Sequence, residues 1–447
     1  MMTLTQAIMT LDPATEAWAA FQQNFFVGWA PVAIFIMATA GFALFYAGMV
    51  RKKNVTHTIL QINVGWTLAF VVYFLIGFPL AYYVSAPVFG LPQFVPTIAN
   101  PLPPLLSETG AYGIAASPSG LGDLATWFKM AMFAITVVGI VPGGMAERDK
   151  FWGWILASAG IAGFIYPVVE HWVWGGGWLS ELGFIDYAGS GVVHLVGGTL
   201  ALTGAYVIGP RIGKFVGDKK MPRTFFGHSI PLSVLGAWLL AFGWFGFNVG
   251  SSVAADPMTI NVELAWVSLT TAMCMAGGMF GAAITSRGHV LTSMVGLLAG
   301  AVAICSGAAI VHPLAGFVIG IIAGVITTFT MGFMEHKLHV DDALGCFPVH
   351  AACGIWGLLA TGIFGGTAIG AHPIYGFADI GTWVGQIGIQ AIGAIAILAW
   401  AGAMGLIMFS ALKKLNLLRA TRDEELYGLD IAIHKTLAYP EDMMDDK

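Results

Sequence analysis

Long apolar runs separated by short polar segments dominate this chain of 447 residues. A helix needs about 20 mainly apolar residues to cross a bilayer, because its backbone groups must bond to one another where water is absent. Eleven runs are long enough, so the pattern predicts eleven membrane-spanning helices. The expected spans are residues 27–50, 58–84, 123–146, 150–173, 188–209, 226–249, 259–285, 290–309, 311–334, 343–366 and 380–412.

The remaining segments are expected to lie outside the membrane. Residues 85–122 are rich in Pro, Gly and Ser, and this composition predicts a loop. Residues 413–447 are polar and predict a cytoplasmic tail after a transmembrane domain that covers residues 1–412. The first 24 residues lack a basic start followed by an apolar stretch, so we expect no cleaved signal peptide.

The composition agrees with an all-α integral membrane protein of the cell membrane. The chain is 57% hydrophobic and only 10% charged, whereas a soluble domain has about 25% charged residues. The four cysteines lie in or beside apolar runs, without the spacing of disulfide or zinc frameworks. We find no phosphate-binding glycine loop, serine nucleophile elbow or nucleic-acid-binding face. The sequence therefore predicts neither an enzyme nor a cofactor or nucleic-acid partner.

The basic residues predict the orientation. Eleven spans place the two ends of the chain on opposite sides. With the N-terminus outside and the C-terminus inside, all 19 Lys and Arg residues except Lys129 fall in inner segments or the tail. This distribution follows the positive-inside rule, and it supports both the count and the topology.

Two apolar spans each contain one histidine. His194 and His350 each follow an aspartate by eight residues, Asp186 and Asp342 respectively. The first lies in the fifth expected span and the second in the tenth, so the two blocks of five spans run in opposite directions. This pattern predicts an inverted repeat, residues 27–209 and 226–366, with a pathway between the halves and an extra helix at 380–412.

The histidines have three interpretations from the sequence. Each could be a separate core histidine bonded to a carbonyl, or the two could form a shared polar line in an apolar pore. The matched pair favours the second, because imidazole offers one donor and one acceptor and can relay a proton. A haem or metal site is the rival. It needs more ligands, and no carboxylate lies within a turn of either histidine in its span.

Aromatic residues gather near the expected outer ends of spans 3, 4 and 6. They include Phe133, Trp172, Trp174 and the segment from Gly243 to Ser251. Composition alone favours an interfacial aromatic belt. The alternative is a cation-π cage for a small ammonium-like ion, with a hydroxyl that accepts a hydrogen bond.

The acidic residues at both ends of the expected bundle are explained without a direct role in binding an ion. Asp186 suits a helix cap better than a direct partner for a cation, because a direct ion pair would hold the cation too tightly to release it. A charged inner segment is too loosely spaced to predict a metal site; it contains Glu335, His336, His339, Asp341 and Asp342.

Several motifs in order resemble the ammonium transporter (Amt/MEP/Rh) family over nearly the whole chain. They are Phe45–Arg51, Ala146–Arg148, Trp174–Leu179, Asp186–Gly189 through His194, Gly243–Ser251, Asp341–Asp342 through His350, and Gly428–Asp430 followed by His434. Trp174 and the tail are similar to the Amt branch. The resemblance implies a homotrimer with one pore in each subunit, and a tail against which PII-type signalling proteins dock in relatives.

The resemblance also implies roles for individual residues. Phe133, Trp174 and Ser251 match the outer recruitment site, with the Ala188 carbonyl nearby and Asp186 as its support. Phe133 and Phe247 match a stacked phenyl gate, and His194 and His350 match the twin pore histidines. Two positions depart from the pattern: Lys129 replaces a neutral residue one turn before Phe133, and Cys305 replaces a threonine found in some relatives.

The function implied is nitrogen uptake. Ammonium would bind outside, lose its proton at the aromatic gate and continue as ammonia past the histidines, with the proton transferred separately. Three alternatives stay open: an ammonium sensor with little flux, an intramembrane metalloenzyme, and a channel for another small neutral solute.

Overall fold

The computed structural model describes residues 28–82, 87–88, 91–92, 118–252, 257–365, 380–439 and 441. Within these residues, ten helices are long and apolar enough to cross a membrane. They are Gly28–Met49, Lys52–Tyr82, Trp127–Met145, Phe151–Glu181, Ser190–Ile208, Ile230–Val249, Val262–Thr285, Pro313–Leu338, Phe347–Phe364 and Gly381–Lys414. Ten of the predicted spans are thereby confirmed as helices of sufficient length, and the protein is a multi-pass membrane protein.

The eighth predicted span is shorter than expected. Its helix, α14 (Val290–Ile304), has 15 residues and ends before residue 309. The segment after α14 is hydrogen-bonded to the loop before His194. The carbonyl groups of Cys305 and Ser306 accept from the backbone N–H groups of Ala188 and Tyr187, respectively. Within the described residues, helix length therefore supports ten crossings, and it decides neither the eleventh crossing nor the orientation.

Several spans combine α-helix with short stretches of wider π-helix. The first half contains η1 (Met37–Gly41), α3 (Phe42–Met49), η2 (Lys52–Asn54), α4 (Val55–Val72), η3 (Tyr73–Gly77), α5 (Phe78–Tyr82), α6 (Pro118–Ile140), α7 (Pro142–Met145), α8 (Phe151–Gly160), η6 (Ile161–Ile165), α9 (Tyr166–Val173), α10 (Trp178–Glu181), η7 (Ser190–Leu195) and α11 (Val196–Ile208). Of these, η2 is a 3₁₀-helix and the other η elements are π-helices.

The second half continues the bundle. It contains α12 (Ile230–Val249), α13 (Pro257–Thr285), α14, α15 (Pro313–Phe333), η8 (Met334–Leu338), η9 (Phe347–Ala352), α16 (Cys353–Phe364), α17 (Ile380–Lys414), α18 (Arg422–Tyr427) and α19 (Leu429–His434). The described strands form two small antiparallel pairs, β1 (Pro87–Val88) with β2 (Leu91–Pro92) and β3 (Phe215–Val216) with β4 (Met221–Pro222).

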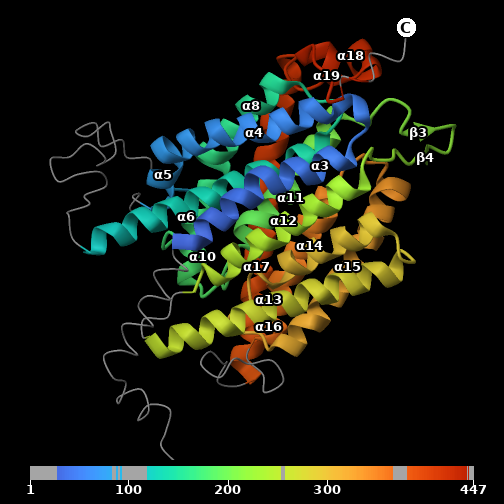
Figure 1. The fold of residues 1–447 in the computed structure, drawn as a ribbon. Coiled ribbons are helices and arrows are strands. Elements are labelled where there is room, and N and C mark those ends of the chain that lie inside the picture. Colours follow the sequence, from blue (N-terminus) through green and yellow to red (C-terminus); the bar gives the residue numbers. More distant parts are fainter. Residues whose placement is uncertain are drawn as a thin grey trace, which may run out of the picture.

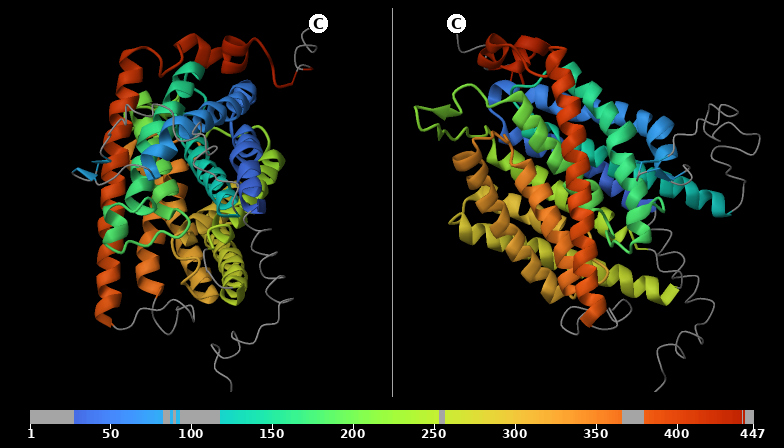
Figure 2. Two further views of the ribbon diagram at one scale, coloured as in Figure 1. Left: turned by 90° about the vertical axis from the view of Figure 1, so that its left-hand side faces the viewer. Right: turned by 180° about the vertical axis from the view of Figure 1, so that it is seen from behind.

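The helices lie side by side in one bundle, and α17 runs along its outside (Figures 1 and 2). The helices α18 and α19 lie across the end of the bundle that also carries β3 and β4, which we call the tail end. We call the opposite end, where α9 finishes at Val173, the far end. α13 packs against α14 and α15, and α11 packs against α17.

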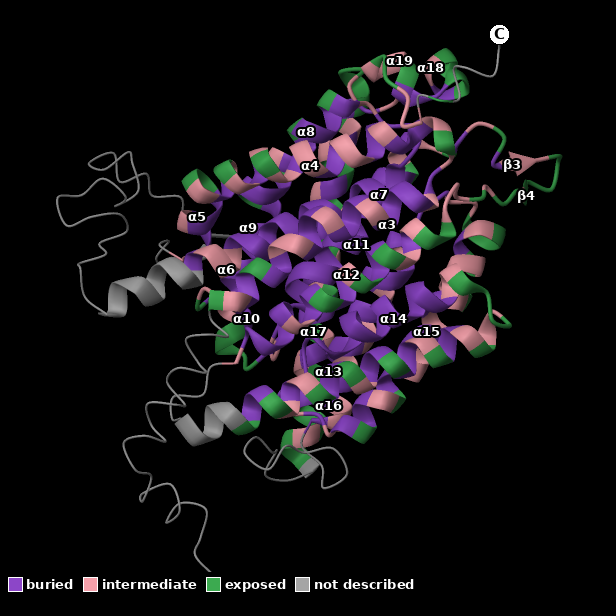
Figure 3. Ribbon diagram, in the orientation of Figure 1, coloured by how far each residue is buried: buried purple, intermediate pink, exposed green. Residues whose placement is uncertain are grey.

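Burial follows the pattern of a protein surrounded by lipid. The centre of the bundle is buried, whereas exposed positions line the outer helices (Figure 3). Many exposed side chains are large and apolar, such as Phe242, Leu269, Phe329 and Ile395. Water would penalise so much exposed apolar surface, so these faces suit a bilayer or a neighbouring subunit.

A buried network of charges closes the tail end of the bundle. Arg211 pairs with Glu147 at 2.7 Å and with Asp341 at 2.8 Å, and Arg51 pairs with Glu147 at 3.0 Å. Burial by itself would raise the pKa of the Glu147 carboxyl, but Arg211 and Arg51 outweigh it and lower that pKa to about 2. Arg148 and Arg211 hold the pKa of Asp341 well below its usual range, although burial opposes the shift. These charges are paired because an isolated buried charge is costly.

The structure modifies two predictions about the polar segments. α6 begins at Pro118, inside the predicted loop 85–122, most of which lies outside the described residues. The tail after residue 413 contains α18 and α19, and Asp430 accepts hydrogen bonds from the backbone N–H groups of Thr56 and His57 at the start of α4. The expectation of no signal peptide concerns residues outside the described ones.

Candidate functional site

The two histidines singled out by the sequence meet in the centre of the bundle. Their Nδ1 atoms lie 3.2 Å apart, within hydrogen-bond distance, although 156 residues separate them. The rings are nearly parallel, with centroids 5.3 Å apart and an interplanar angle of 23°. Both side chains are buried. The structure therefore brings His194 and His350 together as one pair.

The histidine segments have the same local structure. Each histidine lies in a six-residue π-helix, η7 for His194 and η9 for His350. The upstream aspartate caps each of these helices with its carboxylate. Asp186 accepts hydrogen bonds from the backbone N–H groups of Gly189, Gly191 and Val192, and Asp342 accepts them from Cys346 and Phe347. The common spacing of eight residues thus corresponds to a shared way of starting the helix.

Glycines one turn after each histidine allow the two helices to approach closely. A Cβ atom at Gly198 would lie 2.3 Å from the backbone nitrogen of Ala351, and one at Gly354 would lie 2.5 Å from the carbonyl oxygen of Ser190. These distances are too short for any side chain, so glycine is needed at both positions. Since residues four apart share a helix face, this close contact holds the histidine rings within reach of each other.

Trp244 and Phe247 of α12 cover the His194 ring. The Trp244 ring stacks on His194 with centroids 5.3 Å apart, and its Nε1 donates to the Cys305 sulfur at 3.2 Å. The Phe247 ring stacks on His194 at 5.8 Å. Sequence reasoning missed Trp244 as an individual residue. Its position three residues before Phe247, on the same helix face, was the available signal.

The histidine pair offers both a donor and an acceptor in an apolar setting. When both rings are neutral, one Nδ1 carries the shared proton, so one Nε2 is a donor and the other is an acceptor. The Nε2 atom of His194 is buried and has no hydrogen-bond partner. An unsatisfied buried polar atom is costly, so this nitrogen is suited to meet a small polar solute.

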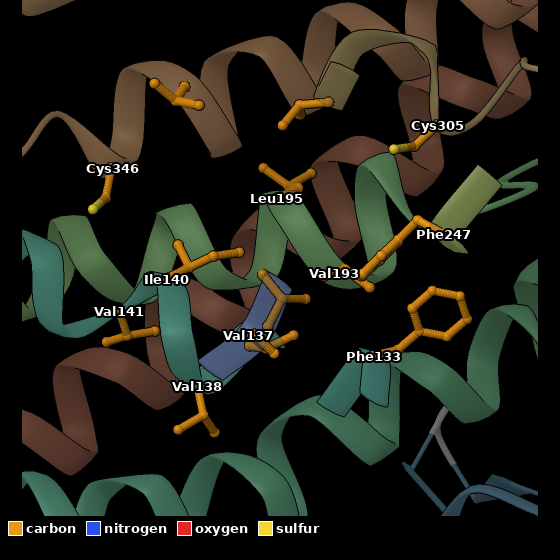
Figure 4. Packing of buried hydrophobic residues seen from close by; sticks show 14 of the residues in the cluster. Phe133, Val137, Val138, Ile140, Val141, Val193, Leu195, Phe247, Cys305 and Cys346 are labelled. Carbon is orange, nitrogen blue, oxygen red and sulfur yellow. The ribbon is translucent and has the colours of Figure 1, made fainter. Parts of the chain in front are cut away.

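An edge-to-face contact between Phe133 and Phe247, rather than the stacked arrangement that was expected, lies between the histidines and the far end. The rings of Phe133 and Phe247 have centroids 4.4 Å apart, and both side chains are almost fully buried. Phe133 also contacts Trp174, with centroids 5.4 Å apart. Figure 4 shows Phe133 and Phe247 at one end of a cluster of buried aliphatic side chains, with Cys346 at the other. The predicted gate residues Phe133 and Phe247 therefore contact each other.

Polar groups lie around the far-end side of this aromatic pair. The Trp174 indole donates to the Asp186 carbonyl at 2.7 Å, and the Ser251 hydroxyl donates to the Phe247 carbonyl at 2.8 Å. Ala188, between Asp186 and the histidine helix, is buried. Burial raises the pKa of the Asp186 carboxyl to about 6, although the hydrogen bonds that it accepts from backbone N–H groups partly oppose the shift. The carboxylate contacts are all with its own backbone segment, which agrees with the cap that the sequence favoured.

Lys129 lies at the same end of the bundle, one turn before Phe133 on α6. Its Nζ donates to the carbonyl oxygen of Gly250 at 3.3 Å, next to Ser251. Among the residues whose side chains are described, which exclude Asp123, neither Glu170 nor any other carboxylate pairs with it. A lysine cation therefore borders the aromatic site.

The residues weighed as metal ligands are dispersed. Glu335 pairs with Lys214 at 2.5 Å, Asp341 pairs with Arg211, and His336 is exposed. In the part of the chain that the structure describes, no group of three or more His, Cys, Asp or Glu residues is arranged to hold a metal ion. The four cysteines are free thiols. The site thus places a histidine pair among buried apolar side chains.

Known proteins resemble this chain over most of its length. The profile of the Ammonium Transporter Family matches residues 25–439. Ammonium transporter Amt1 of Methanocaldococcus jannaschii is 40% identical over 420 residues, which cover 94% of this chain and 97% of the relative. A solved structure described as Sensor Amt Protein has a TM-score of 0.80 and 33% identity, covering 92% of this chain and 98% of the other. Mep2 of Saccharomyces cerevisiae, with a TM-score of 0.74 and 23% identity over 90% of this chain and 88% of the other, shares the fold.

Proposed function

Because the chain belongs to the ammonium transporter family, we propose that it recruits ammonium at the aromatic far end and passes it on as ammonia. The proton crosses separately by way of the histidine pair. The far end faces outside and the tail end faces the cytoplasm, as the distribution of Lys and Arg indicates. The single observation that carries this proposal is the His194–His350 contact at 3.2 Å beside the Phe133–Phe247 ring contact.

Recruitment depends on groups that favour a small cation without holding it permanently. The faces of Trp174 and Phe133 attract a cation by its interaction with the ring electrons. The Ser251 hydroxyl and the Ala188 carbonyl add hydrogen-bond acceptors. Asp186 supports the site at a distance, since its carboxylate is engaged by backbone N–H groups. A site built from neutral acceptors can release the ion again.

Deprotonation follows from the dryness of the path beyond the gate. Burial penalises a charged ammonium group and lowers its pKa by up to about 3–5 units. Passing the Phe133–Phe247 contact removes water from the ion, so loss of a proton becomes the less costly route. Potassium, an ion of similar size, has no proton to lose and stays outside. Deprotonation therefore provides selectivity that a cavity of fixed size would not.

Ammonia then follows the apolar line along the histidine pair. The unpartnered Nε2 of His194 offers a hydrogen bond to the neutral molecule. The shared Nδ1 proton gives the pair a means of relaying the proton by exchange between rings. Net transport is electrogenic if the proton reaches the same side as the ammonia.

Electrical recording on the purified full-length protein in liposomes tests this function. We expect an ammonium step to evoke an inward current that an equal concentration of potassium neither evokes nor blocks. Ammonia flux without current would reject the separate proton transfer, and the absence of both would reject transport.

A sensing role is the second candidate. The structural neighbour described as Sensor Amt Protein and the lysine at the recruitment site favour it. Such a protein would bind ammonium, respond through its tail and carry little flux. Uptake of labelled methylammonium, measured beside ammonium binding, separates the two functions.

The family and the exposed apolar faces support a proposal about the assembly. We propose a homotrimer with one pore in each subunit, whose apolar faces meet lipid and neighbouring subunits. The surface of α18, which carries the exposed Arg422 and Asp423 and the half-buried Glu424, is proposed to bind a PII-type signalling protein. Native mass spectrometry of the full chain in detergent tests the trimer, and addition of a PII-type protein tests the docking.

A further inference from the structure

Cys305 contacts both parts of the proposed pathway. It directly follows α14, and its side chain is fully buried. Its carbonyl oxygen accepts the backbone N–H of Ala188 at 2.8 Å. Its sulfur accepts the indole N–H of Trp244 at 3.2 Å, and the Trp244 ring stacks on His194. One residue therefore joins the loop of the recruitment site to the ring that covers the histidine pair.

The backbone around Cys305 is held by hydrogen bonds that do not involve the thiol. The Ser190 hydroxyl donates to the Val302 carbonyl at 2.8 Å and accepts the Ser306 backbone N–H at 2.8 Å. Ser190 is the first residue of η7, the helix that contains His194. The end of α14 is thus fastened to the start of η7, and a substitution of the Cys305 side chain leaves both of these hydrogen bonds available.

The thiol of Cys305 has a defined orientation. Its S–H group donates to the Ala301 carbonyl at 3.1 Å, one turn earlier in the chain. Because its single proton points to this carbonyl, the sulfur meets the Trp244 N–H as an acceptor. A buried indole N–H needs such a partner, and rotation of the indole away from the sulfur would leave this donor unsatisfied at a cost. The sulfur therefore fixes the orientation of the Trp244 ring.

This orientation matters for the neighbouring histidine. The Nε2 atom of His194 is buried and, among the described residues, has no hydrogen-bond partner. When this nitrogen is the acceptor of the ring, an indole N–H released from Cys305 would compete for it. Bound to Cys305, Trp244 instead presents its ring face to His194, with an interplanar angle of 23°. The open Nε2 then stays available to ammonia.

We infer that Cys305 is a positioning residue, whose sulfur holds Trp244 against His194 and thereby sets the rate at which ammonia passes the histidine pair. This inference rests on the proposed function and adds a residue to it. Cys305 acts through Trp244 and does not itself contact the transported molecule in this role. The hydrogen-bond acceptor, rather than the size of the side chain, is the property that position 305 must supply.

Cys305→Thr and Cys305→Val form a matched pair, because their side chains have nearly the same shape and only threonine offers an acceptor. Currents of the full-length protein in liposomes, recorded over a range of ammonium concentrations, compare them. Cys305→Val should lower the maximal current by about fivefold, as expected for the loss of one hydrogen bond, and Cys305→Thr should retain most of it. The half-saturating ammonium concentration should stay unchanged in both, since Ala188 binds the main chain of Cys305.

Trp244→Phe removes the other partner of this hydrogen bond and keeps an aromatic ring over His194. It should also lower the maximal current. The double variant with Cys305→Val should be no worse than Trp244→Phe alone, because the two changes remove the same interaction. Cys274→Ala is the control, since it removes another buried free thiol, and it should keep the wild-type current.

Infrared spectroscopy follows the hydrogen bond without transport. The S–H stretching band that disappears in Cys305→Thr belongs to Cys305. This band should shift in Trp244→Phe, because the sulfur loses its donor, and it should keep its position in Cys274→Ala. If Cys305→Val fails to fold, this band and the current of Trp244→Phe decide.

The results distinguish a failure of this inference from a failure of the proposed function. A wild-type protein without an ammonium-evoked current would overturn the proposed function. A wild-type protein with that current would overturn the inference alone if Cys305→Val kept the full maximal current, or if Cys305→Thr lost as much as Cys305→Val. An S–H band that does not move in Trp244→Phe would also overturn it.

Discussion

The Nζ atom of Lys129 lies 3.3 Å from the carbonyl oxygen of Gly250, one residue from the Ser251 hydroxyl. The protein therefore carries its own ammonium group at the edge of the site where a free ammonium ion is proposed to bind. A fixed cation in this position opposes the approach of a second one, since like charges a few ångströms apart repel by about 1 kcal/mol or more.

We predict that Lys129→Gln lowers the half-saturating ammonium concentration by about fivefold, because about 1 kcal/mol of repulsion disappears. Currents recorded over a range of ammonium concentrations measure this effect. Lys129→Arg retains the charge and is the control, so it should keep the wild-type value. An unchanged value in Lys129→Gln would show that the lysine charge does not reach the substrate.

The histidine pair should control selectivity. His194→Ala or His350→Ala removes the Nδ1–Nδ1 contact and is expected to abolish either transport or the exclusion of potassium. Currents with ammonium and potassium in competition measure both. His336→Ala is the control, because His336 is exposed near the tail end. Wild-type rate and selectivity in both pore variants would contradict the proposed role.

Glu147 should stabilise the protein above acidic pH. Its folded-state pKa, about 2, lies below the unfolded value of about 4.3, so its contribution is present above about pH 4 and is lost as the pH falls toward 2. Glu147→Gln leaves Arg51 without its ion-pair partner and Arg211 with Asp341 alone, and it should cost about 3 kcal/mol at pH 7. Thermal unfolding in detergent measures the loss.

The pH dependence provides the check on Glu147. The difference in unfolding temperature between wild type and Glu147→Gln should shrink between about pH 4 and pH 2. Glu181→Gln removes an exposed carboxylate and should change little. A difference that stays constant over this range would mean that the Arg211 ion pair is not the source of the stability.

Asp149, in contrast to Glu147, should destabilise the folded protein when its carboxyl group is charged. Burial raises the pKa of its carboxyl to about 6, although a hydrogen bond from Gln61 and the nearby Arg148 charge partly oppose the shift. The charged form therefore costs stability above pH 6, by up to about 3 kcal/mol, and this cost disappears as the pH falls from about 6 to about 4. Asp149→Asn should raise the unfolding temperature at pH 8 and have no effect near pH 4.

The exposed Asp218 offers a control for this prediction. Asp218→Asn should leave the unfolding temperature unchanged at both pH values. An Asp149→Asn variant that is less stable than wild type at pH 8 would show that the Gln61 contact outweighs the cost of burial.

Asp430 should hold the tail against the bundle. Its carboxylate accepts the backbone N–H groups of Thr56 and His57 at 3.0 and 2.8 Å, where the positive end of the α4 dipole favours a negative charge. Asp430→Ala is expected to weaken tail docking by about 1–3 kcal/mol. Hydrogen exchange of residues 422–434 should become faster. The exposed Asp423 provides the control variant Asp423→Ala, and equal exchange in the two would contradict the role of Asp430.

Much of the architecture could be predicted from the sequence. A spanning helix satisfies its backbone groups internally, so its position depends on a local run of apolar residues that can be read along the chain. The same local logic located His194 and His350, since an ionisable residue in an apolar run stands out. The prediction of the eighth span was less accurate. α14 is buried inside the bundle, and hydrogen bonds from the neighbouring loop at Ala188 end this helix before its apolar run ends.

The sequence by itself thus determined the class of protein, the position of most helices and the residues that resemble a known family. Only the tertiary structure decided which residues meet: that the histidines pair through Nδ1, that Trp244 covers His194, that Lys129 donates to a carbonyl and that the Tyr73 and Tyr82 hydroxyls donate to Glu170. The physical reason is that helix formation is local, whereas these contacts join residues up to 156 positions apart. Such contacts depend on how closely two helices approach, and glycines such as Gly198 and Gly354 set that distance only after the bundle has formed.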